Sequence, residues 1–430
     1  MRIENIYKLY KEHFLVDTDT RKIRKNSIYF ALKGENFNGN KFAKEALEKG
    51  ASYAIIDEEE YVSSEKTILV KDVLKTLQDL ASYHREKLQI PIIGLTGSNG
   101  KTTSKELINA VLFEKYKTHA TIGNLNNHIG VPLTLLQMKP DVEIGIVEMG
   151  ANHQKEIAFL CEIAKPNFGY ITNFGKAHLE GFGGIEGVIK GKTELYQFIK
   201  KINGILFINN SIPRQVKESE GMNRIFFGTE EDIPKTRFLE LTPFVKLQLE
   251  DNVIQSNLIG IYNYTNIAAA ISIGNYFKVK NEEIKNAIEN YIPTNNRSQI
   301  LEIKENQIIL DAYNANPSSM KVALENFSML KNPDKILFLG DMFEVGKDTK
   351  KEHQEVVNQI ENYDFERIFL IGNHFFETTI CKENISKYSD FSKFSDENKE
   401  FLVNLTGKTI LIKGSRGMAL ERIVPIIKED

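Results

Sequence analysis

The segment Gly94–Thr103 constrains the fold more than any other part of the chain. It reads GLTGSNGKTT, continues an apolar stretch that begins at Pro91, and precedes SKELINAVLFEKY, which has apolar residues at helical spacing. Small residues between a strand and a helix let backbone N–H groups surround phosphate oxygens, and the helix N-terminus adds positive potential. The segment therefore predicts a phosphate-binding loop within an α/β fold.

Two side chains of this loop add nucleotide chemistry. The Lys101 ammonium can reach the outer phosphates, and the Thr102 hydroxyl can bind magnesium. The pattern is not a complete Walker motif, because Leu95 stands five positions before Gly100. The alternative is a glycine-rich turn with a surface lysine, but the flanking strand and helix favour phosphate binding. The predicted nucleotide contacts of the loop are Gly97, Ser98, Asn99, Gly100, Lys101, Thr102 and Thr103.

Two long regions of the chain alternate short apolar runs with helical stretches, as buried parallel strands with crossover helices do. The runs of the first region are 91–97, 143–150, 168–175 and 204–210. The runs of the second region are 307–314, 335–341, 367–372 and 409–415. Residues 289–299 carry a proline and consecutive asparagines and are expected to link the two regions.

The first part of the chain is expected to form a smaller α/β unit. Runs 26–32 and 51–57 look like strands around a helix, and 73–88 has helical spacing. Because 430 residues exceed what one core usually organises, we predict three α/β domains. These are a small N-terminal domain at 1–86, a central P-loop-type ATPase domain with a mainly parallel sheet at 87–293, and a Rossmann-like C-terminal domain at 294–430.

The composition excludes several classes of protein. The 55 Lys and Arg against 58 Asp and Glu give a net charge of -3, so no bulk positive field indicates nucleic acid or a membrane surface. Cys161 and Cys381 are the only cysteines, which fits a reducing compartment. No signal peptide is evident, and no stretch approaches the ~20 apolar residues of a membrane helix. We expect a cytoplasmic protein without membrane insertion.

Polar side chains at the ends of two predicted strands extend the site, since ligands of open α/β sheets collect beyond the carboxyl ends of strands. Glu148 lies near the end of the run 143–150 and can bind the same magnesium ion as Thr102. His178 follows the run 168–175 in a glycine-rich loop and is a candidate metal ligand. The alternatives are a solvated carboxylate and a structural histidine.

Residues 96–103, TGSNGKTT, resemble the ATP loop of the Mur ligases, a family of ATP-dependent amide ligases. Residues 173–183, NFGKAHLEGFG, and 296–298, NRS, resemble further motifs of this family. The resemblance implies ATP and two Mg²⁺ ions, with Thr102, Glu148, His178 and a carbamylated Lys192 as metal ligands, and Lys190 as the alternative to Lys192. The catalytic residues it implies are Lys101, Lys192, His178 and Arg297, with Arg297 reaching the γ-phosphate.

Residues 260–266, GIYNYTN, resemble the family element near the adenine, which implies contacts of Asn263 and Asn266 there. Asp311 follows a predicted strand of the third domain and is a natural acceptor for the ribose hydroxyls. The alternative for Asp311 and Arg297 is a salt-bridged or capping role. Amide side chains can both donate to and accept from a base edge. Tyr262 stands where many members of the family have histidine.

Residues 311–320, 339–346 and 413–424 resemble the family members that add D-alanyl-D-alanine, and the Asp-Asn-Pro-Arg element of the diaminopimelate-adding members is absent. The substrates implied are UDP-N-acetylmuramoyl-tripeptide, held by the N-terminal domain, and D-alanyl-D-alanine, held by the C-terminal domain. We expect a monomer that binds no nucleic acid. The substrate contacts implied are Thr20, Arg21, Asn36, Thr121, Asn124, Asn126, Asn127, Tyr313 and Asn314.

The mechanism implied begins with transfer of the ATP γ-phosphoryl group to the peptide carboxylate, because oxide is a poor leaving group. The dipeptide amine then attacks the acyl phosphate. A sister ligase that adds another amino acid, or a folate-glutamate ligase, would use the same phosphate chemistry. A rival of another class is a P-loop ATPase or binding module that uses nucleotide as a switch and makes no peptide product.

Overall fold

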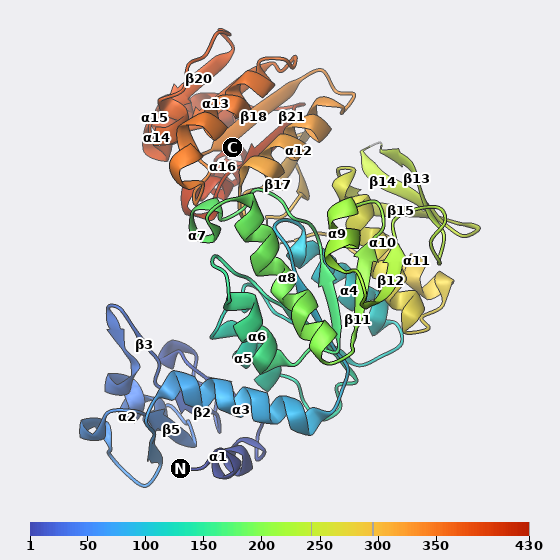
Figure 1. The fold of residues 1–430 in the computed structure, drawn as a ribbon. Helices are drawn as coiled ribbons and strands as arrows, with labels where there is room; N and C mark the ends of the chain where they lie inside the picture. The colour runs from blue at the N-terminus through green and yellow to red at the C-terminus, as the bar shows by residue number, and fades with distance from the viewer. Residues whose placement is uncertain (242, 295, 430) are drawn as a thin grey trace.

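The computed structural model describes residues 1–241, 243–294 and 296–429, so Asn295 of the predicted linker lies outside the described residues. Figure 1 shows three α/β domains that follow one another from the N-terminal unit in blue, through the central unit in green and yellow, to the C-terminal unit in orange and red. The predicted fold class is confirmed. None of the helices among the described residues is both long and apolar enough to cross a membrane.

The N-terminal domain is built on a four-stranded parallel sheet. Helix α3 leads from it to the central domain; the Asp72 carboxylate caps its first turn by accepting from the Lys75 N–H. Strands β2 and β5 and helices α2 and α3 fall where the sequence predicted them. In sheet order the strands are β1 (Val16–Asp17), β2 (Ile28–Phe30), β5 (Tyr53–Ile56) and β6 (Thr67–Leu69), with hairpin β3 (Lys33–Gly34) and β4 (Phe37–Asn38) and helices α1 (Ile3–Tyr10), α2 (Ala43–Glu48) and α3 (Val73–Leu88).

The central domain has a six-stranded parallel sheet with helices on both faces. Because both faces are covered, its inner strands are buried along their whole length, as in β7 and β9. In sheet order the strands are β12 (Asn223–Phe227), β11 (Ile205–Asn209), β10 (Phe168–Ile171), β7 (Ile92–Thr96), β9 (Ile144–Glu148) and β8 (Thr118–Ala120). The helices are α4 (Lys101–Phe113), α5 (Gly130–Leu136), α6 (Glu156–Ala164), α7 (Leu179–Phe182), α8 (Ile185–Lys201), α9 (Pro213–Glu218), α10 (Tyr262–Tyr276) and α11 (Asn281–Asn290).

A three-stranded antiparallel sheet, for which the sequence analysis predicted no strands, precedes α10. Its strands are β13 (Thr236–Leu241), β14 (Phe244–Leu249) and β15 (Asn252–Ile259). Strand β14 alternates buried and half-buried residues, so only one face of the sheet joins the core. That face belongs to the same hydrophobic cluster as α4 and α10.

The C-terminal domain contains the predicted Rossmann-like sheet, with one antiparallel edge strand, β16, added to five parallel strands. In sheet order the strands are β16 (Gln299–Ile303), β17 (Asn306–Asp311), β21 (Thr409–Lys413), β18 (Lys335–Gly340), β19 (Arg367–Ile371) and β20 (Ile385–Tyr388). The helices are α12 (Pro317–Ser328), α13 (Thr349–Ile360), α14 (Asn373–Phe376), α15 (Phe391–Val403) and α16 (Ile423–Lys428). The carboxyl ends of β17 and β21 contribute to a cavity shared with the central domain.

Candidate active site

A cavity of about 770 Å³ lies between the central and C-terminal domains. It is lined by the N-terminus of α4 and by residues beyond the carboxyl ends of central and C-terminal strands, where ligands of α/β sheets bind. The predicted site residues that line it are Ser98, Asn99, Gly100, Lys101, Thr102, Thr103, Asn126, Asn127, Glu148, His178, Asn266, Arg297, Asp311, Tyr313 and Asn314. Residues from segments that are far apart in the sequence are therefore brought together.

The phosphate loop turns sharply between β7 and α4. Gly97 has φ +154°, and a Cβ there would lie 1.8 Å from the Thr172 hydroxyl, so no larger residue fits. The Thr172 hydroxyl donates to the Asn99 carbonyl at 2.6 Å, which fastens the loop to the end of β10. The neighbouring strand thus holds the loop open for phosphate.

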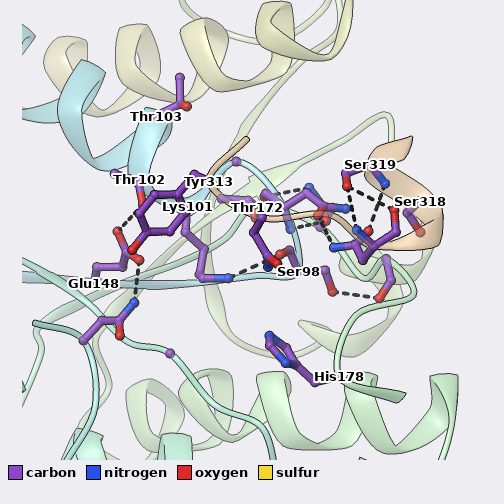
Figure 2. Close-up of a pocket in the computed structure, with 18 of the residues that line it drawn as sticks. Ser98, Lys101, Thr102, Thr103, Glu148, Thr172, His178, Tyr313, Ser318 and Ser319 are labelled. Carbon is purple, nitrogen blue, oxygen red and sulfur yellow. Dashed lines mark hydrogen bonds between the residues drawn. The ribbon is translucent and has the colours of Figure 1, made fainter. Parts of the chain in front are cut away.

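The Lys101 ammonium points along the loop and donates to the Gly97 carbonyl at 2.7 Å and to the Ser98 carbonyl at 3.3 Å (Figure 2). Burial lowers the pKa of Lys101, while Glu148 raises it and Arg297 lowers it by smaller amounts. Two cationic side chains therefore face the same cavity, as binding of several phosphate groups requires.

Thr102 and Glu148, predicted to share a magnesium ion, meet directly. The Thr102 hydroxyl donates to Glu148 Oε2 at 3.0 Å, and the Asn126 amide donates to Glu148 Oε1 at 2.8 Å. The carboxylate is buried, and both of these side-chain partners are neutral, which suits a cation. No group of three or more His, Cys, Asp or Glu is arranged for a metal within the described ranges. Such an ion would therefore take most of its ligands from phosphate and water.

His178 also lines the cavity, but Lys192 does not. The His178 Nδ1 lies 2.5 Å from Glu344 Oε2, and this contact lowers the pKa of Glu344. Lys192 lies on α8 with 1% of its surface exposed, its ammonium 5.4 Å from the centre of the Phe182 ring. Burial, and then repulsion from Lys101, keep the pKa of Lys192 well below its ordinary value.

The two asparagines predicted to lie near the adenine form hydrogen bonds mainly with other residues of the protein. Asn263 donates to the Ile259 carbonyl at 2.7 Å, and Asn266 donates to Asn263 Oδ1 at 2.8 Å. The Asn266 Oδ1 accepts from the Ser104 hydroxyl at 3.0 Å, which ties α10 to α4. Asn263 is buried outside the cavity lining, whereas Asn266 reaches it. Contact of either amide with a base stays a prediction.

On the C-terminal side, aromatic and charged residues face the loop. The Arg297 guanidinium stacks on the Tyr313 ring at 3.7 Å from its centre. Asp311 accepts from Lys413 at 2.5 Å, and the Lys413 side chain is only 2% exposed. The structure makes Lys413 the partner of Asp311.

The domains also touch through side chains that the sequence analysis did not assign to the site. Asn316 donates to Asn99 of the phosphate loop at 2.7 Å, and the Ser318 hydroxyl accepts from the Lys176 N–H at 2.8 Å. Figure 2 shows Ser318 and Ser319 on the opposite side of Lys101 from Glu148. The available signal was the sequence Asn-Pro-Ser-Ser, a helix start directly after a strand end.

The remaining predicted substrate residues are dispersed. Thr121 is buried beside the site, where its hydroxyl accepts from the Glu148 N–H at 3.0 Å, and Asn124 is exposed outside the cavity. Thr20, Arg21 and Asn36 lie in the N-terminal domain, away from the cavity, and the Arg21 guanidinium pairs with Asp19 at 2.8 Å. The structure leaves their predicted contacts with a nucleotide sugar untested.

Three regions of the chain match family models: residues 13–88 the Mur ligase family catalytic domain, 95–274 the Mur ligase middle domain, and 296–416 the Mur ligase glutamate ligase domain. The chain is 35% identical to UDP-N-acetylmuramoyl-tripeptide--D-alanyl-D-alanine ligase of Bacillus subtilis, over 96% of this chain and 93% of the relative. It is 30% identical to the Escherichia coli protein of the same name, over 96% and 94%. MurF from Thermotoga maritima in complex with ADP has a TM-score of 0.83 at 26% identity, covering 96% of this chain and 97% of that one.

Proposed function

Because the chain belongs to the Mur ligase family, we propose that it joins D-alanyl-D-alanine to UDP-N-acetylmuramoyl-tripeptide with cleavage of ATP to ADP and phosphate. The relatives of Bacillus subtilis and Escherichia coli bear this activity in their names and align along nearly their whole length. The observation that carries the proposal is the single cavity in which Lys101, the Thr102–Glu148 pair and Arg297 converge. The product is the UDP-muramoyl-pentapeptide of peptidoglycan synthesis.

The reaction divides into two transfers. The peptide carboxylate attacks the γ-phosphorus, the bond from that phosphorus to the bridging oxygen breaks, and ADP leaves. The dipeptide amine then attacks the acyl carbon, phosphate leaves, and the amine gives up a proton. Phosphoryl transfer depends on positioning and charge stabilisation, so the loop amides, Lys101 and Arg297 stabilise the charge that moves between the two oxygens.

One magnesium ion would be held by Thr102 and Glu148 and a second by His178, and both would supply positive charge to the phosphate oxygens. The Glu344 carboxylate against His178 Nδ1 supports this assignment, because metal-binding histidines commonly present their second nitrogen to a carboxylate. That pairing fixes the ring orientation and leaves Nε2 for a ligand. The fit rests on oxygen and imidazole donors that reach one cavity.

The burial of Lys192 supports its carbamylation. Because burial and Lys101 lower the pKa of Lys192, a larger fraction of its side chain is the neutral amine, which is the form that attacks carbon dioxide. A C–N bond forms, a proton is released, and the side chain becomes an anion. An anion near Lys101 replaces a repulsive contact with an attractive one and adds an oxygen ligand for the second magnesium ion.

The adenosine contacts of Asp311 and Asn266, the sugar contacts in the N-terminal domain and the dipeptide contacts of Tyr313 and Asn314 belong to the same proposal. The position of Asp311 and Tyr313 in the lining of the cavity, beside Arg297, supports these assignments. The monomeric state, the cytoplasmic location and the exact domain boundaries stay predictions.

An isotope experiment tests the mechanism. Tripeptide precursor labelled with heavy oxygen in its terminal carboxylate is incubated with ATP, magnesium and D-alanyl-D-alanine, and product and phosphate are analysed by mass. We expect pentapeptide product and labelled phosphate, because the carboxylate oxygen that joins phosphorus leaves with it. Hydrolysis without pentapeptide would indicate a switch ATPase. Pentapeptide with unlabelled phosphate would exclude the acyl phosphate.

A further inference from the structure

Tyr262 at the start of α10 contacts the segment that carries Arg297. Its hydroxyl lies 2.8 Å from the Ser298 hydroxyl, so a residue of the central domain bonds to the residue that directly follows Arg297. We propose that Tyr262 is a positioning residue, which sets the place of the Arg297 guanidinium through Ser298. The proposal rests on the function proposed above, in which Arg297 contacts the γ-phosphate.

The backbone around Arg297 needs external support. Asn296 has φ +56° and Ser298 has φ +49°, so both neighbours of Arg297 occupy the left-handed region. Side chains other than glycine avoid this region because Cβ crowds the backbone. Two such residues in one short segment persist only where surrounding contacts fix them, and residues held in this way tend to cluster at functional sites.

The contacts that support the segment include three hydrogen bonds between described residues. The Tyr262 hydroxyl bonds to the Ser298 side chain, the Ser298 N–H donates to Asp311 Oδ1 at 3.3 Å, and the Tyr313 N–H donates to the Asn296 carbonyl at 3.2 Å. Asp311 and Tyr313 belong to the C-terminal domain, as does the strand that continues from Ser298. The Tyr262 hydroxyl is therefore a contact by which the central domain, with its phosphate loop, fixes the segment.

Tyr262 is itself held firmly. Gly260 has φ +86°, and a Cβ there would lie 2.4 Å from the Tyr262 ring, so the ring fills the space that a larger residue would occupy. The ring forms part of the wall of the main cavity and of a smaller apolar crevice between the domains. The close approach of the Gly260 backbone restricts the ring on that side and keeps the hydroxyl near Ser298.

A positioning role predicts selectivity for the third phosphate. Losing one of the hydrogen bonds that support the Arg297 segment should lower the affinity for a nucleotide that reaches Arg297. The affinity for a nucleotide that does not reach Arg297 should stay unchanged. Tyr262→Phe removes only the hydroxyl. We expect it to weaken binding of a non-hydrolysable ATP analogue about 2- to 10-fold in the presence of magnesium, with ADP binding unchanged.

The test compares Tyr262→Phe, Ser298→Ala, their double variant and Arg297→Ala in the full chain by calorimetry with the ATP analogue and with ADP. The double variant should lose no more affinity for the analogue than either single variant, because both remove the same bond. Tyr264→Phe is the matched control: it lies on the same helix, and its hydroxyl bonds to the Thr236 carbonyl at 3.0 Å, away from Arg297. It should change neither affinity.

The outcomes separate this inference from the function it rests on. If Arg297→Ala selectively weakens binding of the ATP analogue but Tyr262→Phe does not, the positioning role of Tyr262 is wrong and the role of Arg297 stands. If Tyr262→Phe weakens binding of ADP as much as binding of the analogue, the tyrosine is a general structural residue. If Arg297→Ala leaves the preference for the analogue intact, the assigned contact of Arg297 fails, and the inference fails with it.

Discussion

The Lys176 ammonium lies 2.6 Å from the Glu352 carboxylate and joins the loop that carries His178 to helix α13 of the C-terminal domain. The Glu352 side chain is 7% exposed, whereas that of Lys176 is 48% exposed, so the lysine reaches from the surface to a buried partner. The hydrogen bond to Glu352 raises the pKa of Lys176. With the Ser318 contact of the Lys176 N–H, this ion pair holds the two domains together at one end of the cavity.

Replacing Lys176 by methionine should weaken this contact and favour separation of the domains. Because an ion pair with one exposed partner contributes about 0.2–1 kcal/mol, we expect the KM for D-alanyl-D-alanine to rise about 2- to 5-fold with little change in kcat. Steady-state kinetics measure both constants. Lys351→Met is the control, since the Lys351–Glu355 pair on the same helix lies away from the interface and is exposed on both sides. An equal effect of both variants would assign the change to helix α13 rather than to the interface.

Lys101→Ala should abolish ligation. The substitution removes the cation that we propose contacts the outer phosphates, and loss of one charged donor at a transition state lowers kcat by about 10²–10³-fold. Pentapeptide formation measured by mass checks the result. Lys115→Ala is the control, because Lys115 follows α4 and donates to the Lys278 carbonyl at the other end of that helix. Near-normal product from the Lys101 variant would exclude the loop as the phosphate site.

The parallel sheets were predictable because strands buried on both faces appear as uninterrupted apolar runs. Strands β7 and β18 are buried at every position, and both were predicted from such runs. The antiparallel strands β13 and β14 have one face toward solvent, so their apolar residues alternate with polar ones and form no uninterrupted apolar run. The position of these strands depends on packing against α10, and this packing cannot be recognised from the sequence.

The phosphate loop was predictable because its chemistry is local: the glycines, Lys101 and Thr102 lie within a few residues. The contacts between domains were not, because their partners are remote in sequence. Asn99 and Asn316 are 217 residues apart, and each would be an ordinary loop asparagine on its own. Tyr262 was recognised as a departure from the family pattern, but its contact with Ser298 appears only in the folded chain.

His353 is buried in α13 close to the interface and is held as a neutral imidazole. Its Nε2 accepts from the Met342 N–H at 3.0 Å, and its Nδ1 faces the Thr349 carbonyl at 2.7 Å, so the proton lies on Nδ1. Burial lowers the pKa of His353 below its ordinary 6.5, against smaller opposing effects of neighbours. The titratable groups that face it are Asp341, Glu352 and His374.

This arrangement predicts a loss of stability in mild acid. As pH falls below 6.5, His353 takes up a proton in the unfolded chain before it does so in the folded chain. The contribution of neutral His353 to the stability of the folded chain is therefore complete above this pH and is lost as pH falls. The slope is at most ~1.4 kcal/mol per pH unit. Thermal midpoints between pH 7.5 and 5.5 should fall less steeply in His353→Gln than in the parent protein. The exposed His13→Gln variant should keep the parent slope; equal slopes in all three proteins would contradict the assignment.

Lys192 provides the most direct test of the metal site, because its neighbour Lys190 is a matched control. Lys192 is buried and Lys190 exposed on the same helix, so only the first is placed to become a carbamate beside Lys101. Lys192→Ala should lose at least ~10²-fold in kcat, since the proposed carbamate ligand and its charge would be lost together, whereas Lys190→Ala should keep normal activity. Small carboxylates such as acetate or propionate should partly restore the activity of Lys192→Ala, because they can enter the vacated space and supply the missing oxygen ligand.

The rescue of Lys192→Ala should saturate with carboxylate concentration and should not occur with amines of similar size. Lys192→Arg, which keeps a cation but cannot form the carbamate, should be as inactive as the alanine variant. Full activity of either Lys192 variant would show that the reaction proceeds without a carbamate and that the buried amine serves the packing around Phe182 instead.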